Sequence, residues 1–134
     1  MKFSTFLYFA KFGVRTILFR KKDPILGTII VTDKCNLSCR HCSVNNLTGV
    51  VHPYGQIRGE MEQLYAMGVR ILFFCGGETF LWRDGEKSLR DLVIEAKRMG
   101  FLIVNVVTNG TFPIDLPEAD LILLSLDGDR ERHN

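Results

Sequence analysis

The sequence predicts an α/β fold built on a parallel β-sheet, and two observations support this. First, four apolar runs rich in Ile, Val, Leu and Phe are nearly continuous, which is typical of strands buried on both faces. Second, helical periodicity fills the gaps between the first three runs, as expected for strands joined by crossover helices. The four runs are Leu26–Thr32, Val69–Cys75, Phe101–Thr108 and Asp120–Leu126.

Two amphipathic helices are expected between these runs. Gly68 and Gly100 follow them as C-terminal stops. The third connection, Asn109–Ala119, holds two prolines and has room for one helical turn only. The apolar positions with helical spacing are Ile57, Met61, Leu64 and Tyr65 in the first helix, and Leu89, Leu92, Val93, Ala96 and Met99 in the second.

Residues 1–24 predict a separate N-terminal amphipathic helix. Its apolar positions recur with helical spacing, but Lys11 and Arg15 interrupt any run of the about 20 apolar residues that cross a bilayer. Two alternatives stay open: the helix packs on the domain, or it lies on a membrane surface. The apolar positions are Phe3, Phe6, Leu7, Ala10, Val14, Ile17 and Leu18.

Composition narrows the function classes. The chain has 134 residues, enough for one domain, and its net charge of +2 gives no argument for a nucleic-acid partner. The N-terminal stretch lacks the pattern of a secretory signal, so we expect a cytoplasmic protein, with peripheral contact to a membrane as an alternative. In the cytoplasm thiols stay reduced, so clustered cysteines indicate metal binding or catalysis rather than disulfides.

Each unusual motif follows one of the predicted strands. "CNLSCRHC" follows the first run, "GGE" the second and "TNG" the third, while "SLDG" closes the fourth. Ligands of parallel α/β sheets gather beyond the carboxyl ends of the strands. We therefore expect these motifs to meet at one mouth of the sheet.

Three cysteines within eight residues suit a metal centre. A closed zinc site needs a fourth ligand, for which His41 and His52 are candidates, although His41 sits between two cysteines. A [4Fe–4S] cluster held by three thiolates keeps one iron open for a small molecule. Both alternatives stay open from the cysteines alone.

Taken together, C-x3-C-x2-C, GGE and SLDG in this order resemble the radical S-adenosylmethionine (radical SAM) superfamily. The resemblance implies a partial parallel (β/α) barrel of the TIM-barrel type, of which residues 25–134 would supply about four strands. It also implies a [4Fe–4S] cluster, S-adenosylmethionine (SAM) and an external electron donor such as a flavodoxin or ferredoxin. In this family the reduced cluster cleaves SAM to a 5′-deoxyadenosyl radical, which abstracts hydrogen from a substrate.

The resemblance assigns roles residue by residue. Cys35, Cys39 and Cys42 match the cluster ligands, and Gly76, Gly77 and Glu78 match the segment that meets the methionine end of SAM. Three further positions match contacts to the cofactor: His41, Asn109 and Ser125. His41 is alternatively a solvent-facing loop residue, Asn109 a turn residue, and Asp127 with Gly128 only the turn after the fourth strand.

Two positions depart from the family's pattern. Thr79 stands where Pro usually follows GGE, which removes no ligand. Cys75 stands where Ser or Thr is common, and it is expected to be a small buried hydrophobe, with a substrate-facing or redox-active thiol as the alternative.

The resemblance to a partial barrel predicts an incomplete core, which would be the N-terminal part of a longer protein or a truncated product. Its fourth strand would then be an exposed edge prone to association. The substrate is open: peptide or protein modification, methyl or sulfur transfer, and activation of another enzyme are all candidates. Two other functions stay open, a non-catalytic iron–sulfur or zinc module and an inactive remnant.

Overall fold

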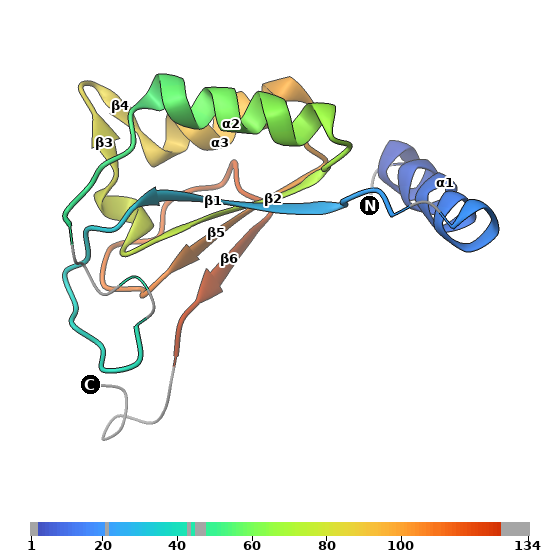
Figure 1. Ribbon diagram of the computed structural model, residues 1–134. Helices are drawn as coiled ribbons and strands as arrows, with labels where there is room; N and C mark the ends of the chain where they lie inside the picture. Colours follow the sequence, from blue (N-terminus) through green and yellow to red (C-terminus); the bar gives the residue numbers. More distant parts are fainter. Residues whose placement is uncertain (1–2, 21, 43, 45–47, 127–134) are drawn as a thin grey trace.

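A computed structural model shows a parallel sheet of four strands in the order β1-β2-β5-β6 (Figure 1). It describes residues 3–20, 22–42, 44 and 48–126. The architecture confirms the predicted α/β class and is compatible with a partial (β/α) barrel. The strands are β1 (Leu26–Thr32), β2 (Ile71–Gly76), β5 (Ile103–Thr108) and β6 (Leu121–Leu124), each within one residue of or inside its predicted run.

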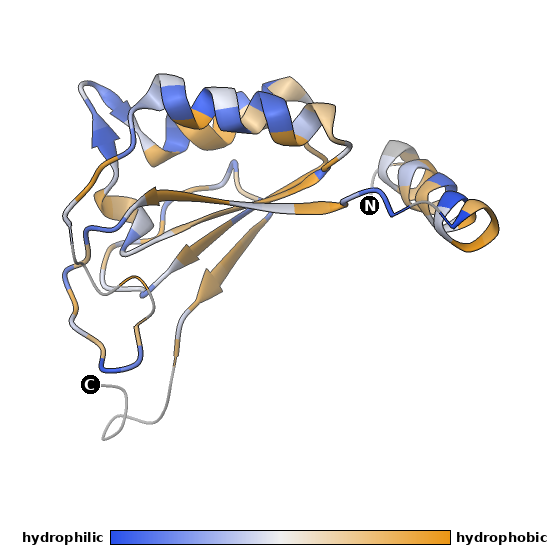
Figure 2. Cartoon of the chain, viewed as in Figure 1, coloured by the Kyte–Doolittle hydropathy of each residue, from blue (hydrophilic) through white to orange (hydrophobic). Residues whose placement is uncertain are grey.

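Helices α2 (Tyr54–Ala66) and α3 (Leu89–Met99) lie side by side on one face of the sheet (Figure 1). Their apolar sides meet the sheet and form the core, while α2 shows hydrophilic residues outward (Figure 2). Gly68 and Gly100 follow the helices with φ of 103° and 98°, which confirms both predicted stops. Fully buried core side chains are Ile57, Met61, Leu72, Phe74, Trp82, Leu92, Val93, Ala96, Val104 and Val106.

The segment between β2 and α3 holds structure that the sequence did not predict. A short 3-10 helix (η1, Thr79–Leu81) leads into a two-stranded hairpin, β3 (Arg83–Asp84) and β4 (Lys87–Ser88). Trp82 is fully buried between them, and its indole Nε1 donates to the carbonyl of His52 at 2.9 Å. This bond ties the hairpin to the start of α2.

The second face of the sheet keeps apolar side chains exposed. Alternate residues of β1 point to it, and Leu26 and Ile30 are 50% and 48% exposed. On the edge strand β6, Leu121 and Leu123 point to the same face and are 53% and 36% exposed. Burial on both faces was therefore predicted wrongly for the described residues, because α2 and α3 both cover the same face.

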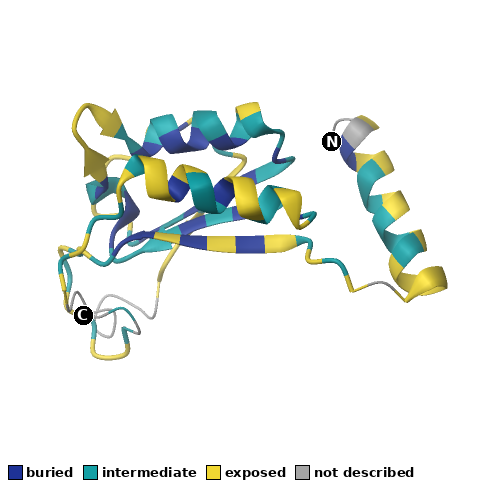
Figure 3. Cartoon of the chain, turned by 45° about the horizontal axis from the view of Figure 1, so that its top comes forward, coloured by how far each residue is buried: buried dark blue, intermediate teal, exposed yellow. Residues whose placement is uncertain are grey.

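Helix α1 (Phe3–Phe19) confirms the predicted N-terminal helix but not its packing. It stands off the end of the sheet where β1 begins, and most of its residues are exposed or half-buried (Figure 3). Phe3, Ile17 and Leu18 are 79%, 77% and 71% exposed, which contradicts burial of the apolar stripe against the domain. Within the described residues, no helix has the length and apolar character to cross a bilayer.

Asp91 caps α3 from its first turn and yields a pH prediction. Its carboxylate accepts from Ser88 N at 2.8 Å and Ser88 Oγ at 3.0 Å, and these bonds lower the pKa of Asp91. A lowered folded-state pKa adds stability above the unfolded value of about 3.9, and that stability is lost as the pH falls through the folded pKa. Asp91→Asn should cost about 1 kcal/mol at neutral pH, and less in acid, in denaturant melts. Glu86→Gln, at an exposed carboxyl in the hairpin turn, should show neither effect; a cost for Asp91→Asn that does not shrink in acid would contradict the assignment.

Candidate functional site

A pocket of ≈ 250 Å³ opens at the carboxyl end of the sheet. It brings together the loop after β1 with residues at and just after the ends of β2, β5 and β6, as the motif order predicts. The predicted site residues that line it are Cys35, Cys39, His41, Cys42, Gly76, Gly77, Asn109 and Ser125, and the other lining residues are Leu37, Val44, Val107 and Thr108.

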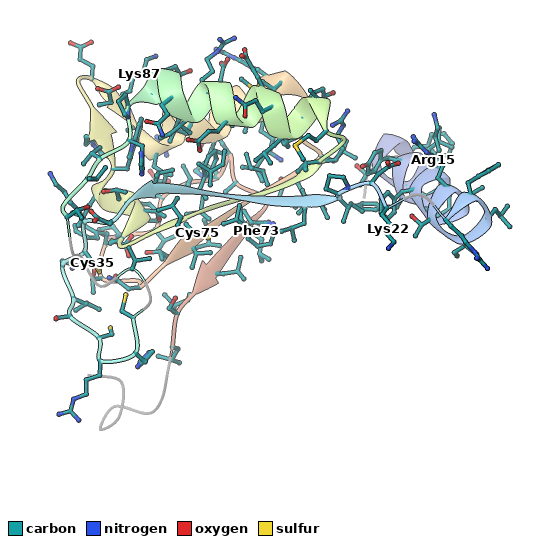
Figure 4. The ribbon with its side chains drawn as sticks, viewed as in Figure 1. Arg15, Lys22, Cys35, Phe73, Cys75 and Lys87 are labelled. Atoms are coloured by element: carbon teal, nitrogen blue, oxygen red, sulfur yellow. The ribbon has the colours of Figure 1, made fainter. Side chains whose placement is uncertain are left out.

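The three cysteines lie on one loop and all are half-buried (Figure 4 labels Cys35). Two N–H groups point at the sulfur of Cys35: Leu37 N at 3.4 Å and Asn109 Nδ2 at 3.6 Å. Cys42 N donates to the carbonyl of Cys39 at 3.2 Å, which closes a turn between the second and third cysteine. In the part of the chain that the structure describes, no three His, Cys, Asp or Glu side chains converge tightly enough to hold a single metal ion.

The base of the cysteine loop is closed by the chain that returns from it. Thr32 bridges to Val51, and its hydroxyl donates to the carbonyl of Val50 at 2.7 Å. The carboxylate of Asp33 accepts from both the hydroxyl and the N–H of Thr48, and these bonds lower the pKa of Asp33. The loop therefore leaves the sheet from a fixed base.

Gly76 and Gly77 pass directly against the backbone of this base. Gly77 N donates to the carbonyl of Thr32 at 2.8 Å, and Glu78 N donates to that of Lys34 at 2.7 Å. A Cβ on Gly77 would lie 2.6 Å from the carbonyl oxygen of Asp33 and closer still to that of Lys34. Only glycine allows this approach, because those neighbours are backbone atoms that cannot turn away.

Glu78 is the predicted residue that does not line the pocket. Its side chain is fully buried behind the pocket wall. Oε1 accepts from Thr108 Oγ1 at 2.8 Å and Phe80 N at 3.0 Å, and Oε2 accepts from Asn109 N at 2.8 Å. The predicted contact between Glu78 and an ammonium group stays a prediction, while the structure shows this carboxylate joining the ends of β2 and β5.

Asn109 connects the β5 end to the cysteine loop. Its Nδ2 donates to Asn36 Oδ1 at 3.0 Å as well as to the sulfur of Cys35, and Asn36 Nδ2 donates to Thr111 Oγ1 at 2.8 Å. Sequence reasoning gave no role to Asn36, Thr108 and Thr111. Their only signal was that they are polar and lie within the motifs CNLSCRHC and TNG or directly after TNG.

The structure also shows where most of the other residues singled out in the sequence lie. His41 is exposed and Ser125 lies at the end of β6, where its N–H donates to the carbonyl of Thr108 at 2.9 Å. Asp127 and Gly128 lie outside the described residues. Cys75 does not line the pocket, and burial raises the pKa of its thiol.

Comparison with known proteins identifies the family of this chain. The family model described as the radical SAM superfamily matches residues 29–133. A relative, the 7,8-dihydro-6-hydroxymethylpterin dimethyltransferase of Methanocaldococcus jannaschii, is 35% identical over 125 residues, which cover 84% of this chain. The match covers 24% of that relative, so the chain spans about a quarter of its length. With the family model covering both the cysteine loop and the glycine motif, the chain belongs to the radical SAM superfamily.

Proposed function

We propose that this chain binds a [4Fe–4S] cluster through Cys35, Cys39 and Cys42 and cleaves SAM reductively in the pocket beside it. The observation that supports this most is the convergence of eight predicted residues from four separate segments on one pocket. When bound, the reduced cluster would supply the electron that splits SAM into methionine and a 5′-deoxyadenosyl radical, which takes a hydrogen atom from the substrate.

The residues present fit an iron–sulfur cluster. N–H groups that point at a ligand sulfur, as Leu37 N and Asn109 Nδ2 do at Cys35, stabilise thiolate charge and tune cluster potential. A four-iron cluster offers a separate iron to each thiolate, so its ligands need not converge on one point. Three thiols of one loop that line the same pocket therefore fit the cluster of this family.

The pocket walls suggest how SAM would be held. Gly76 and Gly77 present bare backbone on the wall next to the cysteine loop, which suits close approach by the methionine end. Ser125 offers a hydroxyl from β6, and His41 offers a flat ring for the adenine. Val107 adds an apolar surface to the pocket lining.

Glu78 and Asn109 act in this proposal mainly by positioning. The carboxylate of Glu78 fixes the N–H of Asn109, and the amide of Asn109 in turn reaches Cys35. A change at Glu78 would therefore be felt at the cysteine loop even without direct contact to SAM.

The substrate is a separate part of the proposal. The similar pterin dimethyltransferase favours methyl transfer as a reaction class beside the peptide or protein modification expected above. Since the match covers 84% of this chain but 24% of that relative, it supports shared SAM chemistry more than a shared substrate. An external one-electron donor of the flavodoxin or ferredoxin type would supply the reduction.

The cluster assignment predicts the iron content of variants. Anaerobic reconstitution with iron and sulfide should load about four irons and four sulfides per chain. Cys42→Ala should lose most of this iron, because one ligand is missing, whereas Cys75→Ala should keep it, since Cys75 lies off the pocket. Iron and acid-labile sulfide analysis reads the result. Tight zinc binding without sulfide would contradict the proposal.

The catalytic part of the proposal is tested with the reconstituted wild-type chain. Chemical reduction in the presence of SAM should release 5′-deoxyadenosine and methionine in equal amounts, measured by liquid chromatography. Full cluster loading with no cleavage product would favour the non-catalytic alternative.

The close approach at Gly77 predicts a strong effect of one methyl group. Gly77→Ala should push the cysteine loop off its base and lower both apo-protein stability and cluster loading, because the new Cβ meets fixed carbonyl oxygens. Gly59→Ala is a matched control, since an added Cβ there in α2 meets nothing within 4 Å. It should stabilise the chain by about 0.5–1 kcal/mol. Equal melting behaviour of the two variants would show that the approach imposes no constraint.

The buried bonds of Glu78 predict a cost that needs no cofactor. Glu78→Gln places an amide donor against the N–H of Phe80 or of Asn109, so the apo chain should lose about 1–3 kcal/mol of stability. Glu62→Gln, which alters only an exposed pair with Arg58, should change stability little. A Glu78→Gln variant with wild-type apo stability but weakened SAM binding would assign this carboxylate to the cofactor alone.

A further inference from the structure

Helix α1 presents its most apolar side away from the rest of the chain. This side, the outer stripe, consists of residues three or four apart, which share one face of a helix. Phe3, Phe6 and Leu7 are 79%, 56% and 57% exposed, and Val14, Ile17 and Leu18 are 49%, 77% and 71% exposed. The outer stripe comprises Phe3, Phe6, Leu7, Ala10, Val14, Ile17 and Leu18.

The opposite side of α1 is the one that meets the body. Tyr8 donates its hydroxyl to the carbonyl of Gly68 at 2.9 Å, and Thr5 on the same side is buried. Arg15 pairs with Asp23 at 2.9 Å. A cavity of ≈ 510 Å³ between helix and body is lined from α1 by Tyr8, Lys11, Phe12 and Arg15. These contacts hold the outer stripe outward.

The basic residues of the N-terminal segment indicate which kind of surface the outer stripe would contact. Residues 1–22 contain six Lys or Arg and no Asp or Glu. Lys11 is exposed and lies four residues after Leu7 and three before Val14, at the flank of the stripe, where a long basic side chain buries its stem and reaches phosphate groups. An apolar stripe on a basic segment without acidic residues complements an anionic lipid surface.

We propose that α1 docks on the surface of an anionic lipid bilayer, with the outer stripe in the acyl region and its axis parallel to the membrane. Its 17 residues extend about 25 Å. In this pose the helix lies in the interface rather than across the membrane, in line with the absence of a spanning helix among the described residues.

This docking leaves the functional pocket facing water. Helix α1 stands at the end of the sheet where β1 begins, while the cysteine loop extends from the opposite end (Figure 1). The chain would be concentrated at a membrane while its pocket stays open to the aqueous side.

The test uses flotation of the purified chain with vesicles of phosphatidylcholine and phosphatidylglycerol in equal parts, beside vesicles of phosphatidylcholine alone. The wild-type chain should float with the anionic vesicles and far less with the neutral ones. Raising the salt from about 0.1 M to about 1 M should weaken the binding, because it screens the basic residues.

Two variants separate the stripe from charge alone. Ile17→Glu puts an acid on the outer stripe, and Thr16→Glu puts the same acid on the neighbouring exposed position, which points away from the stripe. Ile17→Glu should weaken binding roughly tenfold or more, and Thr16→Glu by less than about threefold. Circular dichroism should show equal helix content in both.

Three results would overturn the proposal. They are no flotation with anionic vesicles, equal flotation with neutral ones, and equal loss in the two variants. A lipid-free dimer in sedimentation that Ile17→Glu alone dissociates would assign the outer stripe to a second copy of this chain instead. None of these outcomes depends on cluster loading or SAM cleavage, so they leave the function proposed above untouched.

Discussion

The site depends on the hydrogen bonds that the buried carboxylate of Glu78 accepts. Glu78 is fully buried and gathers donors from Phe80, Thr108 and Asn109, while its own N–H reaches Lys34 at the start of the cysteine loop. Buried carboxylates are costly without such partners, so the network must form as a unit. It joins β2, β5 and the cysteine loop, three segments far apart in the sequence.

The glycines before Glu78 make that network reachable. Because Gly76 and Gly77 have no side chains, the chain after β2 can lie against the carbonyl oxygens of Thr32, Asp33 and Lys34. The same bare backbone forms one wall of the pocket. The close approach of these two backbone segments therefore holds the cysteine loop to the sheet and also leaves room for the cofactor proposed to bind in the pocket.

The two ends of the sheet have opposite character. At the carboxyl end, polar loops are held by hydrogen bonds around a pocket, as Asn109 and Asn36 show. At the other end, α1 meets the body through Tyr8 and leaves its apolar stripe exposed. This polarity places binding chemistry and membrane attachment, as proposed, at different ends of one small domain (Figure 1).

The sequence by itself determined the strands, the two helix stops and the meeting of motifs at one mouth, because apolar continuity, glycine and strand direction are local or directional rules. Tertiary structure decided the rest. No local pattern shows that Glu78 turns inward to Thr108 and Asn109, since its partners lie about thirty residues away. Nor does a helical stripe reveal which way it faces: periodicity predicts the apolar side of α1, but only contacts such as Tyr8 to Gly68 decide that this side points outward.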